Sequence, residues 1–384
     1  MSDSLMASYL ALVSAAVPND FTDNYDYRRF GPIVEPSRQA PKLPLRRRLR
    51  WYYKRILQAF RIIDQPPVYK MDQVASATDW LRPNCENLQF LYEHLEDEVS
   101  KRLLALILAY RALGHRRVKL PLNNPDYWAL FARVERSIDE AEVRDLSFHN
   151  WKIYRLKLEE FGYPFDLFIR PSGVVAQLLL QQYRCQTDRQ VIEVRPGDIV
   201  VDGGGCYGDT ALYLAYKAGP TGRVFSFEFL PENLSIFERN LELNPGIAAR
   251  IKIVRHPMWS SSGEYLYIES AGPATRVLPA PQSPNAVRIE TLSIDDLMRC
   301  EQVSRVDFIK MDIEGSELSA LKGAEQSIRR FKPKLAISVY HKLADFWEIP
   351  QWIDSLGLGY RFSLRHFTIH QEETILFAYC EAPR

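Results

Sequence analysis

The chain has 384 residues, of which 46% are hydrophobic and 25% are charged, a globular composition large enough for two domains or one enlarged domain. Forty-nine basic and forty-eight acidic residues give a formal net charge of +1, so the overall charge does not indicate a nucleic-acid partner. The five cysteines lack C-x-x-C spacing, which argues against a cysteine zinc site or a disulfide framework. These scattered cysteines favour a reducing cytoplasm, and no segment approaches the roughly 18 consecutive apolar residues of a membrane span, so we expect a soluble cytoplasmic protein with possible peripheral membrane contact.

The first part of the chain, residues 1–165, is predicted to be a mainly helical region with a proline-rich connector near 31–44. Residues 45–62 (LRRRLRWYYKRILQAFRI) follow the connector and combine aromatic and aliphatic residues with arginine and lysine, without any acidic residue. This pattern is typical of a basic amphipathic helix, which either packs on the domain or makes peripheral contact with an anionic membrane. From about 86 to 160 the apolar spacing stays helical, and no active-site chemistry is visible there.

The remainder, residues 166–384, is predicted to be the catalytic domain. After about residue 190, short apolar strands alternate with helices, which indicates an α/β fold with a doubly wound, largely parallel sheet. The predicted strands are 198–202, 223–229, 251–259, 306–312, 334–340, 360–367 and 373–380.

A glycine-rich turn, DGGGCYGDT, follows the first of these strands. Asp202, Gly204 and Gly208 have the spacing of a nucleotide-binding loop, but Cys206 occupies the middle glycine position of the dinucleotide pattern. In open α/β sheets, ligands bind at the carboxyl ends of the strands, where such a turn leads into a helix. We therefore expect a cofactor at this loop.

The side chains of the loop indicate which cofactor. Cys206 and Tyr207 add bulk where a pyrophosphate needs open backbone, and Asp209 adds negative charge at the helix start. A ligand with an ammonium group, a sulfonium group and an adenosine suits this loop better, which favours S-adenosylmethionine. The ends of the second and third strands are expected to complete the cofactor site, with the carboxylate of Glu228 at the ribose and with Met258 and Trp259 nearby.

The later strand ends carry the candidate catalytic residues. Asp312 and Glu314 follow the fourth strand, His341 follows the fifth, and His366 lies near the end of the sixth. A histidine can take the proton of an acceptor hydroxyl, so we expect His341 to be the base, with Asp312 orienting the base or the acceptor and His366 as an alternative. Asp312, Glu314 and His341 are also candidate ligands of a divalent metal that would polarise the hydroxyl, although no decisive spacing indicates one.

Five sequence blocks between about 170 and 380 together resemble the FkbM-type methyltransferases: VVDGGGCYGDTALYLA, FSFEFLPENLSIFERNLELNP, VRIETLSIDDL, VDFIKMDIEGSELSALKGA and the closing SVYHKLADFWEIPQWI with YRFSLRHFTIHQEETILFAY. The resemblance implies a class I, Rossmann-like fold that binds S-adenosylmethionine. It also implies methyl transfer to an oxygen, usually a hydroxyl of a sugar or a natural product. The motif positions it carries over are Asp202, Gly204, Gly208, Glu228, Asp312 and Glu314.

The expected acceptor is a hydroxyl of a sugar, within a glycan or a glycosylated lipid. Aromatic and basic residues near the sheet edge are able to stack on sugar faces and donate to hydroxyls: Tyr340, Trp347, Trp352, Arg361, Arg365 and His366. If the acceptor is lipid-linked, residues 45–62 would hold the enzyme on the membrane. A nicotinamide-dependent oxidoreductase and a non-catalytic cofactor-binding adaptor are the alternatives.

Overall fold

A computed structural model describes residues 4–30, 73–146, 152–268, 275, 277–281 and 286–381. The predicted connector at 31–44 and the basic segment at 45–62 lie outside these ranges, so the membrane contact stays a prediction. Within the described ranges, none of the helices combines the length and the apolar character needed to cross a bilayer.

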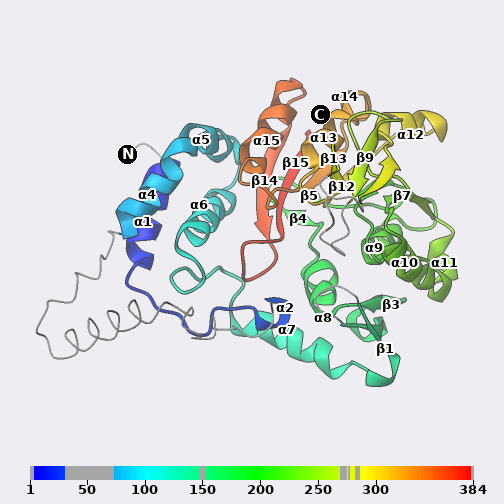
Figure 1. The fold of residues 1–384 in the computed structure, drawn as a ribbon, viewed down its shortest axis with the longest axis horizontal. Coiled ribbons are helices and arrows are strands. Elements are labelled where there is room, and N and C mark those ends of the chain that lie inside the picture. The colour runs from blue at the N-terminus through cyan, green and yellow to red at the C-terminus, as the bar shows by residue number, and fades with distance from the viewer. Residues whose placement is uncertain are drawn as a thin grey trace, which may run out of the picture.

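A seven-stranded sheet with the order β14-β15-β13-β12-β6-β7-β8 forms the centre of the fold (Figure 1). Its strands are β6 (Ile199–Gly203), β7 (Arg223–Phe227), β8 (Ile251–Val254), β12 (Phe308–Met311), β13 (Lys334–Ser338), β14 (Arg361–His366) and β15 (Thr374–Tyr379). The first five pair in parallel, whereas β15 is antiparallel to both of its neighbours. All seven predicted strands and the class I, doubly wound architecture are thereby confirmed.

The order of the strands determines where a ligand can bind. From β6 the chain proceeds to β7 and β8 in one direction, and β12 and β13 extend the sheet in the other. The switch point therefore lies between β6 and β12, where Gly203 is paired with Met311. Open α/β sheets bind ligands at such a point, beyond the carboxyl ends of the strands. The glycine loop after β6 and the acidic segment after β12 both start there.

Helices cover both faces of the sheet. Because successive strand residues point to opposite faces, Val200 packs into one core cluster and its neighbour Val201 into another. The cluster around Val200 includes α9 (Asp209–Ala218) and α10 (Pro231–Leu243), with α11 (Pro245–Ala248) adjoining α9. The cluster around Val201 includes α12 (Ile294–Cys300), α13 (Glu317–Lys322), α14 (Glu325–Phe331) and α15 (Asp345–Ser355).

The N-terminal region adds helices to the same two cores. The helices α1 (Leu5–Ala16), α4 (Gln73–Leu81), α5 (Cys85–His94) and α6 (Glu98–Leu113) join the cluster of Val201, beside β14 and α15 (Figure 1). The helices α2 (Tyr27–Phe30) and α7 (Pro125–Arg136) lie near α8 (Pro171–Gly173) and the π-helix η4 (Val174–Leu179). Short 3-10 helices are η1 (Arg82–Asn84), η2 (Glu140–Glu142) and η3 (Glu159–Phe161).

The prediction that the chain stays helical to about residue 160 is wrong. The strands β1 (Val143–Asp145), β2 (Lys152–Lys157) and β3 (Asp166–Ile169) form an antiparallel sheet there. The strand β2 is held by pairing with β3, a non-local contact that helical spacing of apolar residues cannot reveal. The domain boundary expected at residue 165 falls between these paired strands. Smaller sheets contain β4 (Cys185–Gln186) with β5 (Val191–Ile192), and β9 (Tyr265–Ile268) with β10 (Val277–Leu278) and β11 (Val287–Glu290).

Candidate active site

The loop between β6 and α9 packs directly on the end of β12. Gly204 has a φ of +81°, and a Cβ atom there would lie 2.0 Å from the carbonyl oxygen of Asp312. Gly208 has a φ of +79°, and its Cβ would lie 2.2 Å from the ring of Phe237. Only glycine fits at either position. The role of Gly208 therefore differs from the predicted one, because the residue makes room for α10 and does not line the cavity.

A buried ion pair fixes this loop from behind. The Nζ atom of Lys310 donates to the carbonyl oxygens of Gly203 and Gly204 at 2.9 Å and lies 3.0 Å from Oδ1 of Asp202. Asp202 is fully buried and also accepts hydrogen bonds from Ser226 and Thr210. Asp202, predicted to bind the cofactor, thus lies behind the cavity wall and acts on the loop. Sequence reasoning missed Lys310 because a lysine inside an apolar strand gives no sign of its partner.

One half of the site is a cavity along the ends of β6, β7 and β12. Glu228 lies in its wall, and its carboxylate accepts hydrogen bonds from the backbone N–H groups of Phe229 and Leu230 and from the amide of Asn233. These donors hold the carboxylate in one orientation, although burial still raises its pKa. Other residues lining this half are Gly204, Cys206, Phe227, His256, Pro257, Met258, Val277, Ile313 and Ser316. Glu228 and Met258 thus lie where the sequence predicted them.

The other half, called the polar half below, opens on the opposite side of the glycine loop, and most of the residues that line it are polar or charged. Asp209 lies in its wall, where burial raises the pKa of the carboxyl to about 6 against the opposing charge of Lys310. The backbone and side-chain groups around this half come from the N-terminal region as well as from the sheet. Its lining includes Asp26, Arg29, Tyr127, Arg170, Ser172, Gln177, Gln182, Tyr183, Thr210, Lys310, Tyr340, Thr368, His370 and Glu373.

Four residues line both halves: Gly204, Cys206, Asp312 and Glu314. A ligand in one half and a ligand in the other would therefore meet beside these residues. Glu314 has a φ of +57°, in the left-handed region that non-glycine residues rarely adopt. Burial raises the pKa of its carboxyl to about 7, with the charge of His341 opposing the shift and that of Asp312 adding to it.

The two halves of the cavity meet at Gly204, Cys206, Asp312 and Glu314, a point called the junction below. His341 lies directly behind it. Its Nε2 atom is 3.4 Å from an oxygen of Asp312 and 3.4 Å from an oxygen of Glu314, and its Nδ1 atom is 3.1 Å from Glu317. Burial favours the neutral ring, but the three carboxylates outweigh it and raise the pKa of His341 to about 10. Sequence reasoning missed Glu317, which lies within an apparently ordinary helix start.

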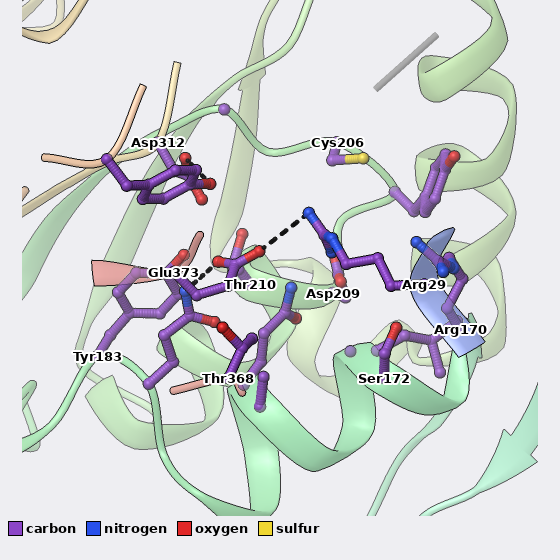
Figure 2. A pocket seen from close by; sticks show the side chains of 18 of the residues that line it. Arg29, Arg170, Ser172, Tyr183, Cys206, Asp209, Thr210, Asp312, Thr368 and Glu373 are labelled. Carbon is purple, nitrogen blue, oxygen red and sulfur yellow. Dashed lines mark hydrogen bonds and ion pairs between the residues drawn. The ribbon is translucent and has the colours of Figure 1, made fainter. Parts of the chain in front are cut away.

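Figure 2 shows the polar half from close by, with Arg29 reaching towards Glu373. An Nη atom of Arg29 lies 3.4 Å from Glu373, which also accepts a hydrogen bond from the Gln182 amide at 2.7 Å. Arg170 lies beside Arg29 at the end of β3, and burial together with the charge of Arg29 lowers its pKa to about 10. None of these residues was predicted, because they come from separate chain segments that only the fold brings together.

Several predicted residues lie elsewhere. The ring nitrogens of His366 contact the hydroxyls of Thr374 and Thr368, and His366 lines neither half of the cavity. Trp259 also lies outside the lining. Of the residues expected to contact a sugar, only Tyr340 reaches the cavity. The others pack or pair away from it: Trp347 and Trp352 against the core, Arg361 with Glu381, and Arg365 with Asp97.

Comparison with known families identifies one domain. Residues 202–362 match the model of the methyltransferase FkbM domain. This range begins at Asp202 and includes the glycine loop, Glu228, the acidic segment after β12 and His341. It ends within β14 and omits the N-terminal residues that line the polar half.

Three relatives illustrate the similarity. Hexuronic acid methyltransferase AglP of Haloferax volcanii is 28% identical over 137 residues, which are 36% of this chain and 54% of that protein. Methyltransferase 1 of Beauveria bassiana is 23% identical over 180 residues, covering 42% of this chain and 72% of that protein. The crystal structure of an FkbM methyltransferase from Methylobacillus flagellatus is 23% identical, with a TM-score of 0.49, and the match covers 80% of this chain and 62% of that one.

Proposed function

We propose that this chain, whose residues 202–362 form a methyltransferase FkbM domain, transfers the methyl group of S-adenosylmethionine to a hydroxyl of a sugar. The observation that carries the proposal is the junction of the two cavity halves at Gly204, Cys206, Asp312 and Glu314. Methyl transfer is an in-line displacement, so it needs a donor and an acceptor held on either side of one point.

The half of the cavity lined by Glu228 suits the adenosine part of the cofactor. The Glu228 carboxylate lies at the end of β7, where it can accept hydrogen bonds from ribose hydroxyls. Met258 and Phe229 offer apolar surface for the base, and Asp209 supplies a carboxylate on the other side of the loop for the ammonium group. A pyrophosphate would meet the charge of Asp209 at the start of α9, which disfavours the nicotinamide alternative.

The polar half suits an acidic sugar. Arg29, which also pairs with Glu372 and Glu373, and Arg170 bring positive charge to this half, where a substrate carboxylate can bind, and Tyr127 and Gln177 can contact sugar hydroxyls. The Haloferax relative is named for methylation of hexuronic acid, which supports the same acceptor class for this chain. The chemistry is an attack of the acceptor oxygen on the methyl carbon. The carbon–sulfur bond breaks, the sulfur keeps the electron pair, and the hydroxyl proton leaves to a base.

We assign the base role to Glu314. The sequence favoured His341, but this ring lines neither half of the cavity and so does not face an acceptor hydroxyl. Glu314 lines both halves, so its carboxylate lies where it can take the proton of an acceptor hydroxyl. His341 then positions the carboxylates of Glu314 and Asp312.

The direct test is incubation of the full chain with methyl-labelled S-adenosylmethionine and a matched pair of acceptors. Glucuronic-acid oligosaccharides and the corresponding neutral glucose oligosaccharides differ only in the carboxylate. We expect label in the acidic acceptor, in an alkali-stable ether. Transfer to the neutral acceptor alone would contradict the role of the two arginines. Cofactor binding without transfer to any hydroxylated acceptor would favour the adaptor alternative.

For Glu228→Gln we expect S-adenosylmethionine binding to weaken by about 1.5 to 3 kcal/mol, the range for a hydrogen bond to a charged group. The substitution keeps the shape of the side chain but removes the charge that faces the ribose. Isothermal titration calorimetry measures the change, and Glu86→Gln on the exposed surface of α5 is the matched control. Unchanged affinity in Glu228→Gln would place the ribose elsewhere.

We expect the affinity for S-adenosylmethionine to fall as the pH drops through about 6. Asp209 is ionised above its pKa of about 6 and attracts the cationic cofactor, whereas below that pH it is neutral. Titrations between pH 5 and pH 7 measure the change. Asp209→Asn should bind more weakly at pH 7 and vary less with pH. A variant that retains the full pH dependence would assign it to another group, with Glu314 the next candidate.

A further inference from the structure

The cluster behind the junction holds an imidazole that carboxylates surround. The His341 side chain is 4% exposed, and neither of its ring nitrogens makes a hydrogen bond to a described residue. The Glu317 side chain is fully buried, and its Oε2 atom also has no hydrogen-bond partner there. Buried polar atoms nearly always make hydrogen bonds, whereas the ring nitrogens here have only carboxylate oxygens at 3.1 to 3.4 Å, an arrangement that a shared cation would satisfy.

The ligand atoms are already close together. One atom from each of Asp312, Glu317 and His341 lies within 4.8 Å of the other two. The carboxylates are also held in place, because the N–H of Ile313 donates to Glu317 at 2.8 Å and the hydroxyl of Tyr340 donates to Asp312 at 2.9 Å. Such bonds orient metal ligands before a metal arrives. The spacing of the ligand atoms and the hydrogen bonds that orient the two carboxylates are therefore those of a preformed cation site.

The charges near the cluster favour a cation. Glu314 adds a third carboxylate at 3.4 Å from His341, and Asp345 adds a fourth nearby, which contacts the backbone N–H of Lys342. The Lys342 ammonium group donates to the carbonyl oxygen of Gly315. Since buried charges need compensation, a divalent ion between the imidazole and the carboxylates would supply it.

We propose that Asp312, Glu317 and His341 bind one divalent metal ion of the kind that accepts mixed carboxylate and imidazole ligands, such as Mn²⁺ or Zn²⁺. The sequence offered Glu314 as the third ligand, and the geometry replaces it with Glu317. Asp312 lines both halves of the cavity, so the ion lies directly behind the point where donor and acceptor meet. It fixes the Asp312 carboxylate there and leaves Glu314 to face the acceptor.

The test is a titration of the full chain, stripped of metal with EDTA, with MnCl₂ and separately with ZnCl₂. Electron paramagnetic resonance measures free Mn²⁺, and calorimetry measures Zn²⁺ binding. We expect one site per chain for at least one ion, weakened about tenfold or more in His341→Asn and in Glu317→Gln. His94→Asn and Glu86→Gln on the exposed surface of α5 are the matched controls and should bind like the wild type. No binding to the wild type, or binding unchanged in both cluster variants, would overturn the proposal.

A second measurement keeps the test decisive if the variants of the buried residues His341 and Glu317 do not fold, because it uses the wild type and a variant of a more exposed ligand. An ion that binds only the folded chain raises its unfolding temperature, so excess metal should stabilise the wild type. Asp312→Asn, at the partly exposed cavity wall, should reduce this stabilisation, and retention of the full effect would count against the site. Failure here is distinguishable from failure of the proposed function, since methyl transfer by a chain that binds neither ion would contradict the metal site and leave the proposed function intact. Stoichiometric metal binding without methyl transfer to any acceptor would contradict the proposed function and leave the metal site supported.

Discussion

Glu314→Gln is expected to lower the turnover of methyl transfer by about 10²- to 10⁴-fold, the usual cost of removing a general base. The substitution keeps the size of the side chain and its place at the junction of the cavity halves. It removes the ability to accept a proton, which the acceptor hydroxyl must lose as the new bond forms. S-adenosylmethionine affinity should change much less, because the base acts on the acceptor and not on the methyl donor.

The measurement is a single-turnover assay with labelled cofactor, accompanied by calorimetric titration of S-adenosylmethionine. Glu348→Gln in the first turn of α15 is a suitable control, since this residue lines neither half of the cavity. Full turnover in Glu314→Gln would exclude it as the base. If His341→Asn then abolished turnover while the metal titration showed no site, the assignment would return to His341.

The parts of the site that the sequence predicted are those encoded within one short segment. The strand before Asp202, the glycines after it and the helix after Gly208 follow one another directly, so their pattern identifies a cofactor loop before any tertiary contact is known. Glu228 was predicted for the same reason, since it directly follows β7. The glycine loop and Glu228 directly follow neighbouring strands of the sheet, so their positions depend on the order of the strands and not on details of side-chain packing.

The parts that the sequence missed are assembled from distant segments. Arg29 belongs to the short helix α2, Arg170 follows β3, and Glu373 precedes β15, yet all three line one cavity. Each is a single charged residue next to ordinary structure, so no periodicity marks it. His366 was predicted because it ends a strand, but β14 lies at the edge of the sheet, away from the switch point. A strand end is informative only when the position of the strand in the sheet is known.

The N-terminal region lines part of the cavity, a position that its composition did not indicate. Asp26, Arg29 and Tyr127 all precede the matched domain and line the polar half, whereas the half with Glu228 is built from the domain itself. This division separates the two tasks of the proposed enzyme. The shared domain would bind the methyl donor, and the N-terminal region would select the acceptor, so the acceptor class can differ between relatives that share the same cofactor loop.

Gly204→Ala is expected to abolish S-adenosylmethionine binding at concentrations that saturate the wild type. The added Cβ would lie 2.0 Å from the carbonyl oxygen of Asp312, a backbone atom that no side-chain movement can displace. The loop and the end of β12 would have to separate, which would disturb Gly204, Asp312 and the hydrogen bonds of Lys310 together. These groups form the junction, so the variant should lose both cofactor binding and turnover.

The positive φ of Gly204 makes a second contribution, which a matched variant can isolate. An alanine at φ +81° carries backbone strain of about 1 to 2 kcal/mol even where space is available. Gly263 has a φ of +79°, and a Cβ atom there would have no other atom within 4 Å, so Gly263→Ala carries the strain without the clash. Calorimetric titration and thermal unfolding of both variants would separate the two effects. If Gly204→Ala bound the cofactor as well as Gly263→Ala does, the close approach of the loop to β12 would not be what forms the cofactor site.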